Sequence, residues 1–170
     1  MRLFKSAVLV KQNQPLKILN LKNPTPGKNQ ILVKIIYSGF CSSQYGEIIG
    51  IKGKDKFIPH SLGHEACGKV EEIGLGVKKV KKNDLVVLHW MKSKGKDSST
   101  IEYRDKDGSK INSGKITTFS YLSLVSENRV TKIKFNNKEQ IKYLPLMGCS
   151  IPVALSTLEK ILRVKKNKNI

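Results

Sequence analysis

Short apolar runs separated by turn-forming residues dominate the first ninety positions of the chain. Runs of this length that are rich in Val and Ile are typical of β-strands. In the run over 30–38, the period-2 rule places Ile31, Val33 and Ile35 on one face and Lys34 on the other. The sequence predicts strands over residues 6–10, 16–21, 30–38, 68–73, 84–90 and 117–125.

Helical patterns are short by comparison. Residues 42–49 begin with serines, which can cap a helix, and end before Gly50. Apolar residues at helical spacing predict two further helices, over 138–146 and 150–164. The fold class that follows is mainly β with short helices (α+β).

The segment 92–113 differs in composition from the strands around it. It is rich in Lys, Gly, Ser and Asp and has few apolar residues. Such a composition is typical of loops. We expect an exposed loop here and no second core.

Charge is the most unusual feature of the composition. The 170 residues hold 32 Lys and Arg against 13 Asp and Glu, for a net charge of +19. A nucleic-acid or polyanion partner is one interpretation. However, only four of these cations are arginines and aromatics make up 6%, whereas nucleic-acid surfaces favour both. A bias toward A/T-rich codons explains the Lys excess without a ligand, so we expect no specific nucleic-acid partner.

The chain has no run of eighteen apolar residues, which excludes a transmembrane helix, and its start does not resemble a signal peptide. Its three cysteines are odd in number and widely spread, so they form no disulfide framework. A cytoplasmic protein without a membrane partner is expected. Cys67 is interpreted as a small buried residue, and His60 and His89 as structural or surface residues, with a substrate contact by His89 left open.

Cys41, His64 and Cys149 are side chains of the type that binds zinc. Spacing alone makes this a weak signal, because the two cysteines are more than a hundred positions apart. The surrounding motifs strengthen it. They are GFCSS at 39–43, GHEACGKV at 63–70 and GC at 148–149.

In identity, order and spacing these motifs resemble the N-terminal, GroES-like part of the zinc-dependent medium-chain alcohol dehydrogenases. The resemblance implies a GroES-like, partly open β-barrel. It also implies that Cys41, His64 and Cys149 hold one catalytic zinc, with Glu65 close enough to approach the metal as a ligand or to tune it. Ser43 matches the hydroxyl that takes the proton of the substrate alcohol.

The implied activity is oxidation of an alcohol or polyol, or reduction of a carbonyl, with hydride exchanged with NAD(P). Three departures bear on it. The segment after Trp90 lacks the four cysteines of a structural zinc lobe, Gly46 replaces a relay histidine, and Val153-Ala154 replaces Thr-Gly.

The resemblance stops where a Rossmann domain would begin, and no Gly-x-Gly-x-x-Gly motif occurs. Residues 1–170 are therefore predicted to be one GroES-like domain that ends before the cofactor-binding domain. In this domain the 92–113 loop would replace the zinc lobe. Alone it is expected to be inactive. A non-catalytic GroES-like binding or assembly module is the alternative. A separate Rossmann-domain chain and a homo-oligomer remain open as partners.

Overall fold

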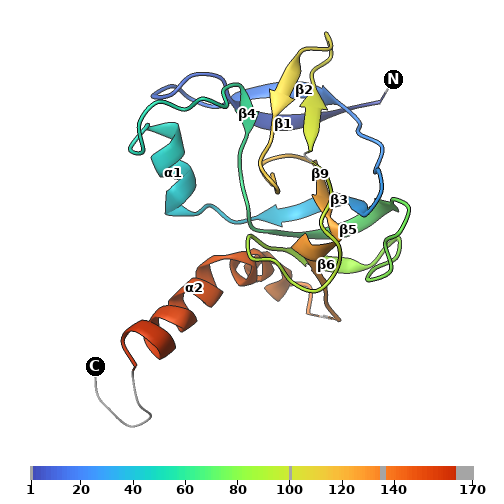
Figure 1. Ribbon diagram of the computed structural model, residues 1–170, viewed down its shortest axis with the longest axis vertical. Helices are drawn as coiled ribbons and strands as arrows, with labels where there is room; N and C mark the ends of the chain where they lie inside the picture. The colour runs from blue at the N-terminus through green and yellow to red at the C-terminus, as the bar shows by residue number, and fades with distance from the viewer. Residues whose placement is uncertain (1, 100, 135–136, 164–170) are drawn as a thin grey trace.

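The computed structural model describes residues 2–99, 101–134 and 137–163, and its body is built from two curled β-sheets (Figure 1). The first sheet has the strand order β2-β1-β4-β8-β7 and the second β10-β6-β5-β3-β9. Among the described residues, the strand pairings are antiparallel except for one parallel contact between β4 and β8. The strands are β1 (Leu3–Leu9), β2 (Lys17–Lys22), β3 (Gln30–Ser38), β4 (His60–Ser61), β5 (Ala66–Ile73), β6 (Leu85–Leu88), β7 (Glu102–Arg104), β8 (Lys110–Asn112), β9 (Leu122–Ser126) and β10 (Val130–Lys132).

Strand β3 separates the two halves of the core. Ile31 and Val33 join one buried cluster with residues of β5, β6 and β10, as the period-2 rule predicts. Leu32 points the other way, into a second cluster with residues of β1, β7 and β8. Because both faces of β3 are covered, its first half is buried throughout. The mainly β fold class predicted from the sequence is confirmed.

The expectation of an exposed loop over 92–113 is wrong in its second half. Strands β7 and β8 form a hairpin there, and Ile101, Tyr103 and Ile111 are buried in the second cluster. The Tyr103 hydroxyl accepts hydrogen bonds from the Leu124 N–H at 2.8 Å and from the Thr117 hydroxyl at 3.3 Å. Three apolar residues spread among polar ones give little periodic signal, so the sequence did not reveal that this hairpin closes one side of the core.

The helices lie within a few residues of the predicted ranges, but the predicted 138–146 helix is a 3-10 segment shifted by two residues. They are α1 (Ser42–Ile48), the 3-10 segments η1 (Glu127–Arg129) and η2 (Gln140–Gly148), α2 (Ser150–Ser156) and the π-helical η3 (Thr157–Ile161). Cys41, not a serine, is the N-cap of α1, and no side chain caps it. The strand predicted over 117–125 begins only at Leu122. The end of the last predicted helix, Val164, lies outside the described residues.

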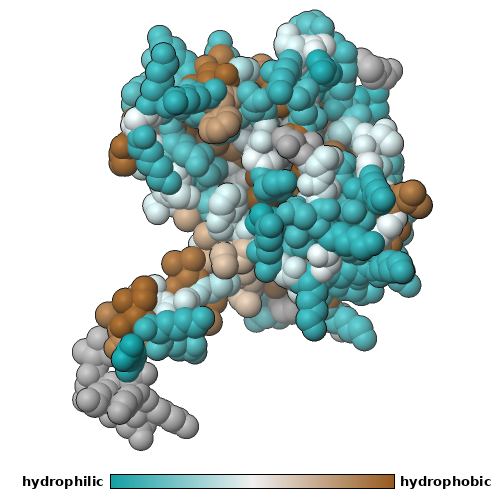
Figure 2. All heavy atoms as spheres, in the orientation of Figure 1, coloured by the Kyte–Doolittle hydropathy of each residue, from teal (hydrophilic) through white to brown (hydrophobic). Residues whose placement is uncertain are grey.

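Helix α2 and η3 project from the body of the molecule (Figure 1). Their apolar side chains are largely exposed, and they gather on the projection in Figure 2. These residues are Val153, Leu155, Leu158, Ile161 and Leu162. Among the described residues no single helix is long and apolar enough to cross a membrane. The segments Gln140–Gly148 and Ser150–Ile161 meet that criterion only as a pair bent by 57°.

The Lys-rich turn at 78–82 and the segment 92–99 are joined by one buried carboxylate, that of Glu127. One of its oxygens accepts the N–H groups of Lys78 at 2.6 Å and Lys79 at 2.8 Å, and the other accepts the N–H of Lys96 at 3.0 Å. Burial acts to raise the pKa of Glu127, but the three N–H groups outweigh burial and lower it. The segment 92–99 and the Lys-rich turn are thus held together by hydrogen bonds to Glu127.

We predict that Glu127→Ala destabilises the protein by about 3 kcal/mol, because it leaves three N–H groups without an acceptor at roughly 1 kcal/mol each. Since the pKa of Glu127 is lowered on folding, its contribution is present above the ordinary value of 4.5 and is lost as the pH falls below it. Urea unfolding at pH 7 and pH 4 measures both effects. The control is Glu139→Ala, which removes an exposed carboxylate; Glu139 is the N-cap residue of η2, but its side chain makes no cap hydrogen bond. Equal stability of the two variants would contradict the prediction.

Candidate metal centre

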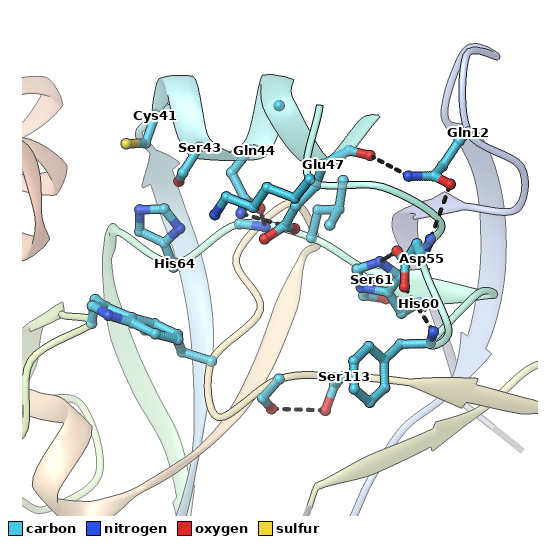
Figure 3. Close-up of a pocket in the computed structure, with 18 of the residues that line it drawn as sticks. Gln12, Cys41, Ser43, Gln44, Glu47, Asp55, His60, Ser61, His64 and Ser113 are labelled. Atoms are coloured by element: carbon cyan, nitrogen blue, oxygen red, sulfur yellow. Dashed lines mark hydrogen bonds and ion pairs between the residues drawn. The ribbon is translucent and has the colours of Figure 1, made fainter. Parts of the chain in front are cut away.

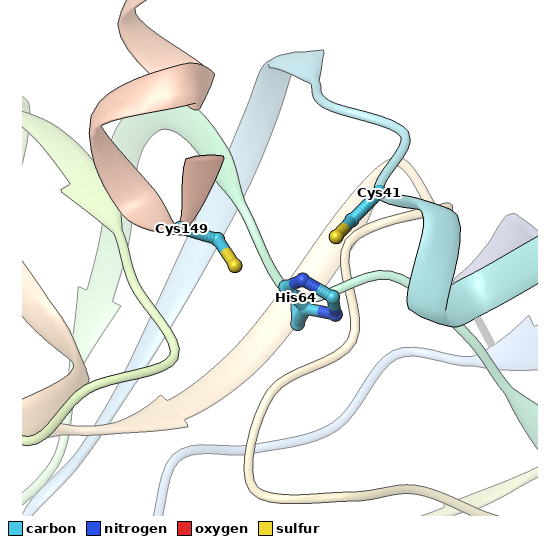
Figure 4. A group of neighbouring side chains, drawn as sticks. All are labelled: Cys41, His64 and Cys149. Carbon is cyan, nitrogen blue, oxygen red and sulfur yellow. The ribbon is translucent and has the colours of Figure 1, made fainter. Parts of the chain in front are cut away.

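Three segments far apart in the sequence bring Cys41, His64 and Cys149 together (Figure 4). Cys41 lies in the turn from β3 to α1, His64 between β4 and β5, and Cys149 between η2 and α2. The two sulfur atoms and a ring nitrogen of His64 all lie within 4.8 Å of one another. Figure 4 shows both thiol groups directed toward the imidazole.

The environments of His64 and Cys41 favour their metal-binding forms, the neutral imidazole and the thiolate, whereas that of Cys149 favours the neutral thiol. Burial lowers the pKa of His64, which keeps the imidazole neutral. Partial burial acts to raise the pKa of Cys41, but hydrogen bonds from the N–H and hydroxyl of Ser43 outweigh it and lower the pKa. Burial, followed by the charge of Cys41, raises the pKa of Cys149 to about 11. A divalent cation would relieve the repulsion between the two thiolates.

The donor set and one orphaned atom fit a zinc ion. The Nε2 atom of His64 is buried and has no hydrogen-bond partner among the described residues. A buried polar atom without a partner is costly, and a metal ion would satisfy it. Two thiolates and one imidazole are three protein ligands, which leaves a fourth tetrahedral position for water or substrate.

Glu65 lies in the segment of His64 and is hydrogen-bonded to the segments that carry the other two ligands. Its backbone oxygen accepts the N–H of Gly39, two residues before Cys41, at 2.9 Å. Its carboxylate accepts the N–H of Ser150 at 3.2 Å and the Ser150 hydroxyl at 3.1 and 3.2 Å. Because Glu65 directly follows His64 in the chain, this one residue ties the three ligands to a common frame.

Close packing around Glu65 explains two glycines of the motifs. A Cβ atom on Gly39 would lie 2.7 Å from the Glu65 side chain. One on Gly148 would lie 2.3 Å from the Leu88 carbonyl oxygen and 3.0 Å from the Cβ of Glu65. Real Cβ atoms do not approach other atoms so closely. Any side chain at either position would therefore push a cysteine-bearing segment away from Glu65.

The role implied for Glu65, as a ligand or as a group that tunes the metal, stays a prediction, and its charge acts on all three ligand groups. The carboxylate is 1% exposed and directed to Ser150, and it is not part of the three-residue ligand group. It also acts on the site by holding the ligands in place. Ser43, the predicted proton acceptor, lines the same cavity as Cys41, His64 and Cys149.

That cavity has a volume of about 760 Å³ and extends from the metal group toward the loop 52–57 (Figure 3). Trp90 lines it and its ring lies 5.9 Å from that of His64. His89, for which a substrate contact was left open, is instead buried and does not line the cavity. Its ring bonds to the Met91 carbonyl at 2.6 Å and to the Thr131 hydroxyl at 2.9 Å. Cys67 is fully buried, as predicted.

Sequence reasoning missed Gln44 and the loop 52–57. Gln44 is buried, and its side-chain oxygen accepts the N–H of Gly63, next to His64. Its amide group donates to Glu47 at 3.3 Å. Gln44 follows the GFCSS motif directly, so its position beside that motif was the only available signal.

Comparison with known proteins agrees with this geometry. Residues 27–135, more than half of the chain, match the alcohol dehydrogenase GroES-like domain. The chain belongs to this family. The curled sheets are accordingly those of a GroES-like, partly open barrel.

Two curated relatives extend the match to nearly the whole chain. Alcohol dehydrogenase-like 3 of Arabidopsis thaliana is 27% identical over 197 residues, which cover 97% of this chain and 50% of that protein. An S-(hydroxymethyl)glutathione dehydrogenase of Escherichia coli is 24% identical over 188 residues, covering 98% and 51%. The chain therefore spans about half the length of the curated relatives that it matches.

Solved structures show the same fold. An alcohol dehydrogenase zinc-binding domain protein from Burkholderia ambifaria superposes with a TM-score of 0.83 at 22% identity. Benzyl alcohol dehydrogenase from Acinetobacter calcoaceticus superposes with a TM-score of 0.78, also at 22% identity. In both cases the likeness covers 97% of this chain and 50% of the other.

We predict that the purified protein binds one zinc ion per chain and that Cys41→Ala or His64→Ala abolishes the binding. The reason is that the described residues contain one group of metal-ligating side chains with this geometry. Elemental analysis of protein prepared without chelator measures it. Cys67→Ala is the control, because it removes a thiol outside the group. Two zinc ions per chain, or none, would count against the site.

We predict that Glu65→Gln weakens zinc affinity about 10- to 100-fold, the usual effect of removing a group that orients metal ligands. The amide nitrogen would face the Ser150 N–H in place of an acceptor oxygen. A competition titration with a chromogenic chelator measures the affinity. Glu47→Gln is the matched control, since the Glu47 charge also acts on His64 but its carboxylate accepts its hydrogen bond from Gln44 and not from Ser150. Equal loss in both variants would point to charge alone and not to positioning.

Proposed function

We propose that this chain is the zinc-holding half of an alcohol dehydrogenase, which oxidises an alcohol or polyol or reduces the corresponding carbonyl. One observation carries the proposal: Cys41, His64 and Cys149 converge at one end of a cavity that Ser43 also lines. Membership of the alcohol dehydrogenase GroES-like family supports the reaction class. A non-catalytic module would have no need of three ligands beside a substrate-sized cavity.

Cys41, His64 and Cys149 would hold the zinc ion, and a zinc ion bound there would act as a Lewis acid on the substrate oxygen. Ser43 would orient the substrate. Its hydroxyl donates to the Cys41 sulfur, so its oxygen lone pairs remain free to accept the hydrogen bond of an alcohol. Trp90 and Leu62 line the cavity and would exclude water from the reacting groups.

Hydride exchange requires NAD(P), for which this chain contains no Gly-x-Gly-x-x-Gly motif. The relatives are about twice as long as the chain. We infer that a nucleotide-binding half, in the same polypeptide or a separate one, completes the enzyme. The exposed apolar residues of α2 and η3 are the surface that such a half would cover. The chain alone should then hold substrate without turning it over, because nothing fixes nicotinamide against the substrate carbon.

We predict that Ser43→Ala lowers kcat about 10²-fold or more in enzyme completed with a nucleotide-binding half, while zinc content stays at one per chain. The half can be taken from the Arabidopsis relative and fused to or mixed with this chain. NAD(P)H absorbance during alcohol oxidation measures the rate. The control is Ser42→Ala, which changes the neighbouring exposed serine that does not line the cavity.

Two results would overturn the proposal. One is zinc-free turnover by the completed enzyme. The other is a zinc-loaded chain whose Trp90 fluorescence does not respond to a small alcohol. Trp90 is the single tryptophan and lines the cavity, so its fluorescence reports binding there.

A further inference from the structure

The cavity has a second end, opposite the metal group. In Figure 3, Cys41, Ser43 and His64 lie at one side of the pocket and Gln12, Asp55 and His60 at the other. The far end is formed by the loop 52–57, which connects α1 to β4. Neither the zinc ligands nor the proposed chemistry uses this end.

The far loop is held in place by hydrogen bonds. The Gln12 amide donates to the Gly53 carbonyl at 3.0 Å, and its oxygen accepts the Asp55 N–H at 3.0 Å. The Asp55 carboxylate accepts the N–H of Phe57 at 2.7 Å and pairs with the His60 Nε2 at 2.5 Å. The charge of Asp55 is therefore already occupied by groups of its own loop and strand.

Three lysines of this loop line the cavity, namely Lys52, Lys54 and Lys56. They take part in no ion pair within the described parts of the chain. Glu47 and Asp55 are the carboxylates of the lining; Glu47 bonds to the Gln44 amide and Asp55 to His60. The far end thus presents an excess of positive charge that the protein itself does not neutralise.

The lining also includes apolar side chains, from Trp90 beside His64 to Phe57 in the far loop, together with Leu62 and Ile116. A ligand that fills the cavity would therefore place a reacting oxygen near Cys41 and His64, an apolar chain in the middle, and a negative group near the lysines. All three regions would contribute to the affinity for such a ligand, because charge complementarity and apolar burial act on different parts of it.

We propose that Lys52, Lys54 and Lys56 select substrates that carry an anionic group, a carboxylate or a phosphate, separated by an apolar chain from the alcohol or aldehyde. This inference rests on the proposed function for the reacting end, but the anion preference is a separate property of the loop. Each exposed charge pair contributes modestly to binding, and the three lysines together should raise the affinity for an anion about tenfold.

The test uses the zinc-loaded chain and ω-hydroxycarboxylates of increasing length, their methyl esters and the matching hydroxyalkyl phosphates, with binding followed by Trp90 fluorescence. We expect either anion to bind about tenfold more tightly than the ester of the same length, with the preference reduced at high salt. A K52Q/K54Q/K56Q variant should lose the preference and keep its affinity for the esters.

The control is K17Q/K28Q/K82Q, which removes the same charge from three exposed lysines outside the cavity. If it loses the preference as fully as the loop variant, the overall charge of +19 attracts the anions and the inference is overturned. Equal affinity for anions and esters also overturns it. Failure of the proposed function looks different: the esters then bind no better with zinc than without it, whatever the anions do.

Discussion

The site depends on one buried carboxylate with its neighbouring backbone. Glu65 is 1% exposed, and it bonds to the segment that carries Cys41 and to the segment that carries Cys149. A charged group in such surroundings is stable only when its hydrogen bonds are made, so the Ser150 contacts and the position of Cys149 are fixed together. Gly39 and Gly148 are needed because the segments meet here at van der Waals distance. The geometry of the candidate centre is therefore set before any metal arrives.

The strands and the Cys41 motif could be predicted from the sequence because they depend on residues close together in the chain. The strand over Gln30–Ser38 and the cysteine just after it lie within one motif, and alternation of side chains decides which face of β3 is buried. The ligand set needed the family resemblance, since Cys41 and Cys149 are distant in sequence and spacing alone is uninformative. The structure then brought their sulfur atoms and His64 within 4.8 Å.

What could not be read depends on contacts between distant segments. The hairpin around Tyr103 has few apolar residues, and its Tyr103 hydroxyl bonds to β9, a contact that no local pattern predicts. The bond from Ser150 to Glu65 could not be predicted for the same reason, because the two residues are 85 positions apart. The hydrogen bonds of Glu127, which join the turn at 78–79 to Lys96, could not be predicted either, because no local sequence pattern indicates them.

The place of Cys149 between η2 and α2 has a thermodynamic consequence. A metal held by Cys41 and Cys149 would cross-link the projecting helical segment to the barrel, in addition to the Ser150–Glu65 contact. Any partner that covers the apolar side chains of α2 and η3 would favour the same arrangement of that segment. Two ligands that stabilise one arrangement raise each other's affinity by the same factor. Metal loading and partner docking would thus be coupled equilibria, with the helical segment as the element that they share.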